Sequence, residues 1–257
     1  MDLHLKGQYF LVGGAGSGFG KAVAEALASE GANVLAVSRT EEKLKSLQAA
    51  SKGAIDILAA DLTKEHTHEL ILNYFGDKKL SGAFINAGGP PAGGFDEVNM
   101  DAWEEAWKTV VRWKISLTQK LLPLLKANSY GRLLYLESVS VKQPVPNLIL
   151  SNALRPAVVG MTKTLAQEVA GMGITVNVLA PGYHGTAAME RLFQKKSELA
   201  GISVEEAKKS FEADIPVGEM GKPEELASLA LWLLSPLSRF VTAQVFDHAG
   251  GMVKSMI

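Results

Sequence analysis

The sequence predicts an α/β fold with one doubly wound parallel sheet, covered by helices on both faces to give three layers. The main observation is that short β-rich apolar runs alternate with longer segments of 3.6-residue periodicity along all 257 residues. Right-handed crossovers then wind such strands outward in both directions. The second observation is that no internal repeat, low-complexity tract or linker interrupts the chain, so we expect a single domain over residues 1–257.

Seven apolar runs are the expected strands. They are Tyr9–Val12, Asn33–Val37, Ile55–Ala59, Ala83–Ile85, Arg132–Leu136, Thr175–Leu179 and Gln244–Phe246. Helical periodicity is clear over residues 21–29 and 41–49. Residues 182–216 carry no strand signal and are expected to form two short helices. Because this segment follows a late strand, we interpret residues 183–216 as a substrate lid.

Composition narrows the possible partners. The 26 basic and 27 acidic residues give a net charge of −1, so no basic field attracts nucleic acid. The absence of cysteine excludes disulfides, thiolate nucleophiles and cysteine metal sites. The N-terminus lacks a secretory signal, and the most apolar helical stretch, Leu226–Leu234, is far shorter than the roughly 20 residues of a membrane span. We expect a cytoplasmic protein with no membrane or nucleic-acid partner.

A glycine-rich turn follows the first strand. Residues 13–20 read Gly-Gly-Ala-Gly-Ser-Gly-Phe-Gly and lead into a helix. A strand, a glycine turn and a helix N-terminus form a pyrophosphate site, because backbone N–H groups point at the anion and only glycine permits the close approach. A tight turn with no ligand is the alternative. The contacts are expected at Gly14, Ser17, Gly18, Phe19 and Gly20.

The end of the second strand indicates which dinucleotide binds. An acidic residue here would bind the ribose hydroxyls of NAD, but none occupies positions 37–40. Arg39 suits the extra phosphate of NADP, although Glu41 and Glu42 follow at once and weaken phosphate binding. A solvated arginine at a strand end is the alternative. We expect NADP rather than NAD.

Further runs match a known family in order along nearly the whole chain. They are Asp61-Leu62-Thr63, Ile85-Asn86-Ala87-Gly88, Pro181-Gly182 with Thr186, and residues 215–218, 222–225 and 247–251. With Gly14, Gly18 and Gly20, and with Gly13 where threonine is usual, these runs resemble the short-chain dehydrogenase/reductase family, especially its 3-oxoacyl-acyl-carrier-protein reductases. The resemblance implies a Rossmann-type fold. It also implies hydride transfer between NADP(H) and a small-molecule carbonyl or acyl substrate.

The resemblance also implies roles and an assembly. Asp61 and Leu62 would lie at the adenine ring, whereas Pro181, Gly182 and Thr186 would hold the nicotinamide carboxamide. Further cofactor contacts are implied at Asn86, Ala87 and Gly88. A homo-oligomer, tetramer or dimer, is implied, packed through the long helices after the fourth and fifth strands and through the C-terminal strand. Trp103 and Trp107 would belong to such a surface or to the core.

The family's catalytic pattern is only partly present. The family uses a tyrosine, a lysine four residues later, a serine thirteen residues earlier and an asparagine. Ser138 matches the serine, but Ser151, Arg155 and Val110 stand where tyrosine, lysine and asparagine are expected. The implied catalytic residues are therefore Ser138, Ser151 and Arg155. An aliphatic hydroxyl is far less acidic than a phenol, and an arginine effectively never releases its proton.

Other side chains are candidates to replace the missing acid. Tyr183 and His184 follow Pro181-Gly182, and either would reach the pocket if the loop folds inward; otherwise both face solvent on a mobile loop. Glu137 is expected to point away from the face of Ser138 and to play no part. His66 and His68 do not share a helical face and are interpreted as surface residues, so no metal site is expected.

Three functions remain open from the sequence. The first is an NADP-dependent reductase acting on a carbonyl compound. The second is a nucleotide-binding homologue without effective turnover, serving as a sensor, a scaffold or a partner subunit. The third is a different reaction in which Arg155 binds an anionic substrate.

Overall fold

All seven expected strands lie in one parallel sheet. The computed structural model describes residues 2–51 and 54–256 of the chain. The strand order is β3-β2-β1-β4-β5-β6-β7, and every neighbouring pair is parallel. The predicted doubly wound sheet is thereby confirmed. The strands are β1 (Tyr9–Gly13), β2 (Asn33–Ser38), β3 (Ile55–Ala59), β4 (Leu80–Ile85), β5 (Gly131–Leu136), β6 (Ile174–Pro181) and β7 (Val245–His248).

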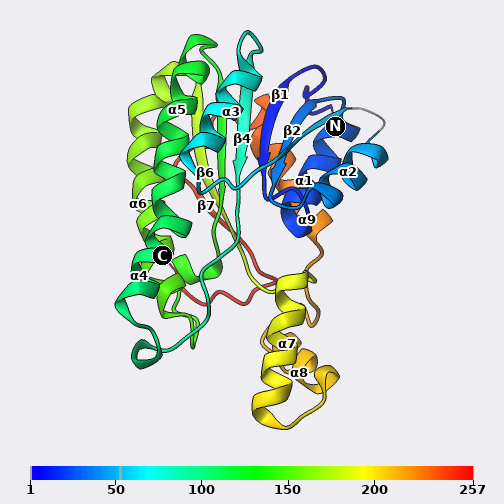
Figure 1. The fold of residues 1–257 in the computed structure, drawn as a ribbon, viewed down its shortest axis with the longest axis vertical. Coiled ribbons are helices and arrows are strands. Elements are labelled where there is room, and N and C mark those ends of the chain that lie inside the picture. Colours follow the sequence, from blue (N-terminus) through cyan, green and yellow to red (C-terminus); the bar gives the residue numbers. More distant parts are fainter. Residues whose placement is uncertain (1, 52–53, 257) are drawn as a thin grey trace.

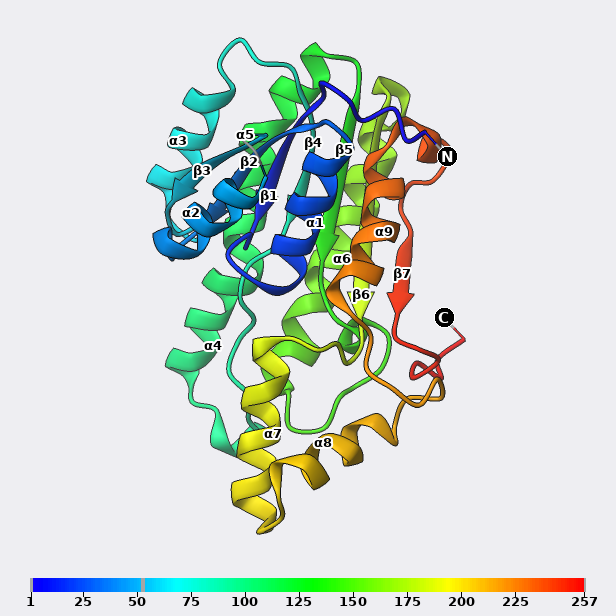
Figure 2. The same cartoon turned by 90° about the vertical axis from the view of Figure 1, so that its right-hand side faces the viewer.

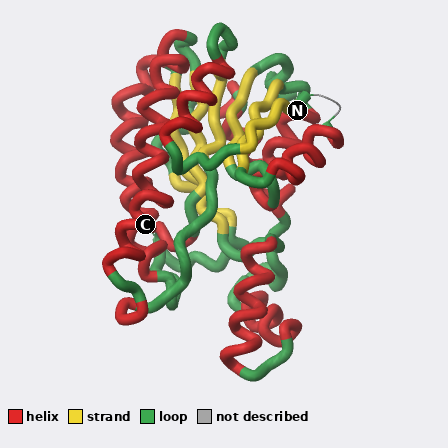
Figure 3. Tube along the Cα trace, viewed as in Figure 1, coloured by secondary structure: helices red, strands yellow, loops and turns green. Residues whose placement is uncertain are grey.

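Helices cover both faces of this sheet, which gives the three layers seen in Figures 1 and 3. One apolar core lies under α1, α2 and α9, and the other lies under α3, α5 and α6. The central strands β1, β2, β4, β5 and β6 place alternate side chains in these two cores and are therefore buried on both faces, as is typical of a parallel sheet, whereas the edge strands β3 and β7 are partly exposed. The helices are α1 (Gly18–Ser29), α2 (Glu41–Ala50), α3 (Glu65–Phe75), α5 (Trp113–Ala127), α6 (Ile149–Val169) and α9 (Pro223–Leu234).

The order of the strands creates a crevice at their carboxyl ends. The chain winds from β1 through β2 to β3 on one side and returns to place β4 on the other side of β1. The loops after β1 and β4 therefore diverge, and ligands of open α/β sheets bind at such a switch point. The glycine turn follows β1 directly, so the fold places it at this crevice.

Two helices extend beyond the carboxyl ends of the strands (Figure 2). They are α7 (Ala187–Ala200) and α8 (Val204–Glu212), and they confirm the expectation of helices between residues 182 and 216. A separate small apolar cluster of Met189, Phe193 and Ala207 holds them together. Their role as a lid stays a prediction. Within residues 2–51 and 54–256, no helix has the length and apolar character that crossing a membrane requires.

Candidate cofactor and catalytic site

The glycine turn has a backbone that side chains would obstruct. Gly14 and Gly18 have φ angles of 63° and 53°, which favour glycine. A Cβ on Gly20 would lie 2.4 Å from the carbonyl oxygen of Gly14, so the turn and the first turn of α1 are in backbone contact. Ser17 precedes α1, and its side chain makes no capping hydrogen bond. The first N–H groups of α1 are therefore not taken by a Ser17 side-chain cap, which suits a pyrophosphate.

Two segments distant in sequence close on this turn. The Asn86 side-chain amide donates to the carbonyl oxygen of Gly13 at 3.2 Å, which places the residues after β4 beside those after β1. Thr186 lies on the other side, because a Cβ on Gly18 would be 3.5 Å from its methyl carbon. The structure therefore brings together the predicted contacts of the glycine turn, the Asn86–Gly88 run and Thr186. Pro181 ends β6 and leads into this region.

The end of β2 presents polar groups to the same crevice. The Ser38 hydroxyl is buried and has no hydrogen-bond partner among residues 2–51 and 54–256, and a Cβ on Gly16 would be only 2.7 Å from it. Arg39 is exposed beside it. Partial burial acts to raise the pKa of the Asp61 carboxyl. The Thr63 N–H and hydroxyl, which donate to it at 2.9 and 2.8 Å, and the charge of Arg39 outweigh this effect and lower its pKa. An unpaired hydroxyl, a cation and a glycine cradle fit a phosphorylated dinucleotide.

The side chains expected to be catalytic form a compact group. Ser151 is buried on α6, and the Arg155 Nε donates to its hydroxyl at 2.9 Å. The Ser151 hydroxyl also lies 3.1 Å from that of Ser140. Ser138 is linked to this group through Ser140, because the Ser138 hydroxyl accepts a hydrogen bond from the Ser140 N–H at 3.3 Å. Sequence reasoning missed Ser140, although the Ser-Val-Ser run at 138–140 places two hydroxyls in one turn.

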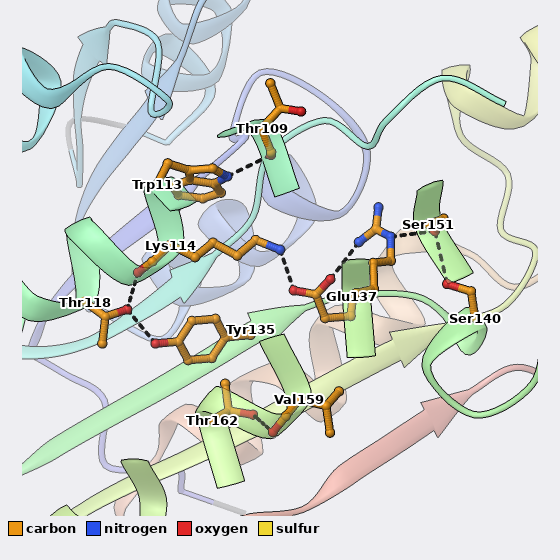
Figure 4. Close-up of polar contacts among 11 residues, drawn as sticks. Thr109, Trp113, Lys114, Thr118, Tyr135, Glu137, Ser140, Ser151, Val159 and Thr162 are labelled. Atoms are coloured by element: carbon orange, nitrogen blue, oxygen red, sulfur yellow. Dashed lines mark hydrogen bonds and ion pairs between the residues drawn. The ribbon is translucent and has the colours of Figure 1, made fainter. Parts of the chain in front are cut away.

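Arg155 belongs to a buried ion network that the sequence did not reveal (Figure 4). Its Nη1 donates to Glu137 at 2.9 Å, and the ammonium of Lys114 donates to the other carboxylate oxygen of Glu137. The prediction that Glu137 stands apart from the site needs correction, because α5 and α6 bring both cations to the face on which Glu137 lies. We call Lys114, Glu137 and Arg155 the ion triad.

The residue at the expected asparagine position lies next to this triad. Val110 is buried within a short π-helix, Lys108–Arg112, that joins α4 (Met100–Trp107) to α5. Lys114 follows four residues later, so it lies one turn along the same buried face. Burial lowers the pKa of Lys114; the Glu137 carboxylate opposes this shift, and the Arg155 guanidinium adds to it.

Tyr183 and His184 are both held by packing. Tyr183 lies edge-on to Phe211 with ring centroids 5.1 Å apart, so it belongs to the cluster between α7 and α8. His184 is buried, with Nδ1 at 3.1 Å from the Gly182 carbonyl oxygen and Nε2 at 2.8 Å from Nδ1 of His248. The alternative in which both face solvent is wrong. Burial lowers the pKa of His184, although its contact with Gly182 opposes the shift.

The two remaining histidines have different environments. His66 is exposed, as expected. The prediction that His68 is a surface residue is wrong, because it is fully buried with Nε2 at 2.8 Å from the Leu62 carbonyl oxygen. It therefore braces the segment that carries Asp61 and Leu62. Across residues 2–51 and 54–256, no group of three or more His, Cys, Asp or Glu side chains is arranged to hold a metal ion.

A mainly apolar cavity of about 290 Å³ lies beside the start of α6. The loops after β4 and β5 form it, and Asn152 fixes its wall by pairing with the backbone of Val145 at 3.0 and 2.9 Å. Ser151 is adjacent to Asn152 in the chain. The lining residues include Phe95, Pro144, Val145, Pro146, Leu148 and Ile149.

Comparison with known proteins places this geometry among reductases. A family model described as enoyl-(acyl carrier protein) reductase matches residues 14–253. The 3-oxoacyl-acyl-carrier-protein reductase FabG of Thermotoga maritima is 30% identical over 259 residues, covering 98% of this chain and 100% of the relative. The NADPH-dependent reductase BacG of Bacillus subtilis is 26% identical over 250 residues, covering 95% and 96%. A crystal structure of an actinorhodin polyketide ketoreductase variant with NADPH is 28% identical, with a TM-score of 0.89 and coverage of 96% and 98%.

Proposed function

Because the chain belongs to the short-chain dehydrogenase/reductase family, we propose that it is an oxidoreductase that transfers hydride between NADP(H) and a carbonyl or alcohol substrate. The observation that carries this proposal is the crevice itself, where the glycine turn, the unpaired Ser38 hydroxyl and Thr186 converge. The relatives include one NADPH-dependent reductase and one ketoreductase crystallised with NADPH, which supports NADP as the cofactor.

Different residues of the crevice contact different parts of the cofactor. The N–H groups at Ser17, Gly18 and Phe19 bind the pyrophosphate at the N-terminus of α1. Ser38 and Arg39 bind the phosphate on the adenosine ribose, and Asp61 and Leu62 flank the adenine. Asn86, Ala87 and Gly88 lie along the middle of the cofactor, and Pro181, Gly182 and Thr186 hold its nicotinamide end. When bound, the cofactor supplies or accepts the hydride.

Ser151, Arg155 and Ser138 interact with the substrate oxygen that is protonated in the reaction. The Arg155 Nε always donates to the Ser151 oxygen, so the Ser151 hydrogen is left for Ser140 or for the substrate oxygen. As hydride reaches the carbonyl carbon, negative charge develops on that oxygen, and hydroxyl donors backed by a guanidinium stabilise it. The proton that completes the alcohol comes from water, because neither an aliphatic hydroxyl nor arginine is an effective acid near neutral pH.

The substrate is a small carbonyl or acyl compound with an apolar part. The apolar cavity of about 290 Å³ beside the start of α6 offers a place for that part, within reach of the Ser151 region. The relative from Thermotoga maritima is a 3-oxoacyl reductase, which supports an acyl substrate. A strongly anionic substrate is less well matched, because Glu137 already pairs with Arg155.

The protein is further proposed to be a cytoplasmic homo-oligomer, a tetramer or a dimer. Trp103 and Trp107 do not enter the core; with Leu154 they line a hollow of about 460 Å³ between α4 and α6, and Trp107 is 43% exposed. Exposed aromatic side chains at a helix face are typical of interfaces between subunits. Light scattering after size-exclusion chromatography is expected to give two or four times the chain mass, and a monomer would contradict the assembly.

The decisive experiment follows NADPH oxidation by the absorbance of the reduced nicotinamide. The protein is mixed with NADPH and a panel of ketones and 3-oxoacyl thioesters, with substrate-free mixtures as the background. Oxidation of at least one compound is expected. NADPH binding without oxidation across the panel would instead support the sensor, scaffold or partner-subunit alternative. Failure to bind either NADPH or NADH by calorimetry would overturn the cofactor assignment.

A further inference from the structure

We infer that Glu137 is a positioning residue of the catalytic site: one of its carboxylate oxygens aims the Arg155 guanidinium at Ser151, and Lys114 occupies the other oxygen. The inference rests on the proposed function for its catalytic consequence. Glu137 and Lys114 stand outside the serine, tyrosine and lysine positions of the family pattern. The observations that carry it are the burial, the contacts and the charges of the ion triad (Figure 4).

The first step concerns the carboxylate of Glu137. Its side chain has no exposed surface, and each of its two oxygens has one cationic donor. A buried carboxylate is tolerated only when it is paired and hydrogen-bonded. Glu137 directly follows β5, and its backbone N–H donates to the carbonyl oxygen of Leu179 at 2.8 Å. The sheet therefore fixes the backbone from which the Glu137 side chain extends. A rigidly placed, fully paired carboxylate is a reliable anchor for a long side chain.

The second step concerns the orientation of Arg155. The guanidinium is planar, so two fixed hydrogen bonds from different nitrogens determine both its position and its plane. The Nε bond goes to Ser151 and the Nη1 bond goes to Glu137, each at 2.9 Å. Without Glu137 the Ser151 contact alone would leave the plane free to rotate. Glu137 therefore decides whether the Nε–H is directed at the Ser151 oxygen.

The third step concerns the free edge of the guanidinium. The second terminal nitrogen, Nη2, points at the turn after β4, because a Cβ on Gly89 would lie only 2.8 Å from it. Glycine at this position leaves the space that the larger cation needs. The triad thus holds one edge of Arg155 against Ser151 and Glu137 and presents another edge beside the Gly88-Gly89 turn.

The fourth step concerns Lys114. Two cations and one carboxylate leave a net charge of +1 when Lys114 is protonated. Glu137 with Arg155 alone would be neutral, and the carboxylate would use one oxygen to fix the arginine while the other remained buried without a donor. Lys114, itself buried, donates to that second oxygen. Its role is to saturate Glu137 without displacing Arg155.

The test compares two double variants that both lack the Lys114–Glu137 ion pair. In Lys114→Gln/Glu137→Gln, one amide group can donate to the other, and the Gln oxygen at 137 still accepts from Arg155. In Lys114→Met/Glu137→Leu, the pair becomes apolar, and such replacements of buried ion pairs often preserve stability. The charge of Arg155 is unchanged in both. We expect kcat per folded enzyme to stay within about threefold of wild type in the first and to fall at least tenfold in the second, because only the second removes the acceptor that aims Arg155.

A structural readout accompanies the kinetics. In ¹⁵N-labelled protein, the Nε–H signal of Arg155 is expected to exchange slowly with solvent in wild type and in the Gln pair, and to broaden in the apolar pair. If the Lys114→Met/Glu137→Leu variant does not fold, the single change Glu137→Gln provides the test instead. Its amide nitrogen must face one of the two cations, so kcat should fall, and adding Lys114→Gln should restore it. Glu69→Gln removes the exposed ion pair between α3 and α5 and is the matched control with unchanged kcat.

The outcomes separate this inference from the proposed function. Equal kcat and equal Arg155 Nε–H exchange in the two double variants would overturn the positioning role, and so would a Glu137→Gln loss that Lys114→Gln does not restore. If wild type binds NADPH but reduces no compound, the proposed reaction fails. The exchange of the Arg155 Nε–H then still decides whether Glu137 aims the guanidinium.

Discussion

The glycine turn and the Ser151 region lie at the same edge of the sheet, yet their polar groups are satisfied in opposite ways. The turn presents a helix N-terminus to which Ser17 gives no side-chain cap, and it lies beside the Ser38 hydroxyl, which has no partner among the described residues. Around Ser151 the side chains satisfy one another, through the hydroxyl of Ser140 and the ion triad. The first region offers groups that suit the proposed cofactor, whereas the second holds its own groups in place.

This difference shows where each region is vulnerable. The binding region depends on the space that glycines leave, so an added carbon damages it. The Ser151 region depends on matched hydrogen bonds between side chains, so a lost partner damages it, because an unpaired buried group carries its full desolvation cost. Four changes test the contrast.

The largest effect is expected from restoring the family pattern. In Ser151→Tyr/Arg155→Lys, a phenol near a cation can act as a general acid, which is typically worth about 10²–10⁴-fold in rate. If the cofactor region is intact, carbonyl reduction with NADPH should rise by about 100-fold. Ser151→Phe/Arg155→Lys has the same ring without the hydroxyl and should show no such gain. An equal rate in the two variants would mean that the acid does not limit the reaction.

A carbon added to the glycine turn should have the next largest effect. Gly20→Ala would place a Cβ 2.4 Å from the Gly14 carbonyl oxygen, so the turn must shift. Overpacking of this kind costs about 1–3 kcal/mol, and the Kd for NADPH should rise by about 10- to 100-fold in calorimetry. Gly160→Ala in α6, with no atom within 4 Å of the added carbon, is the control. Unchanged affinity in Gly20→Ala would argue against the turn as the binding site.

A smaller effect is expected at the adenosine end. Arg39→Asp removes the cation beside Ser38 and supplies a carboxylate suited to ribose hydroxyls. The Kd for NADPH should rise by about tenfold, as a lost charged hydrogen bond implies, and the Kd for NADH should fall. Lys45→Ala removes an exposed lysine that pairs with Glu41 and should change neither value by more than about twofold. An unaltered preference between the two cofactors would contradict the role of Arg39.

The smallest effect concerns acid stability near His184. Burial lowers the pKa of His184 below that of the unfolded chain, so on acidification the unfolded state takes up the proton first. Stability is therefore full above the unfolded value of about 6.5 and is lost as the pH falls through the folded pKa. His184→Gln should flatten the dependence of Tm on pH as the pH falls below about 6.5. His66→Gln, at an exposed site, should retain the wild-type slope, and a steeper slope in His184→Gln would refute the shift.

The glycine region could be predicted nearly in full from the sequence. The information that specifies it is local: a strand, five glycines and a helix lie within residues 9–29, and the spacing of the glycines reflects backbone demands that few other residues meet. The strands were predicted for the same reason, with errors confined to their ends. Leu80, for example, lies in β4 but precedes its predicted start.

The ion triad could not be predicted in this way. Lys114 and Arg155 lie 23 and 18 positions from Glu137 in the chain, and they meet it only because α5 and α6 pack on the same face of β5. His68 was misassigned for a related reason, since it faces α5, where the Ser116 hydroxyl, 48 residues away in the chain, lies 3.2 Å from its Nδ1.

The sequence by itself determined the sheet, the order of helices and strands along the chain, the glycine turn after the first strand and the residue types at positions 110, 151 and 155. Tertiary structure alone decided which charges those residues meet. The physical reason is that backbone conformation and apolar periodicity are properties of neighbouring residues, whereas the pairing of buried ions depends on which helices the sheet brings together.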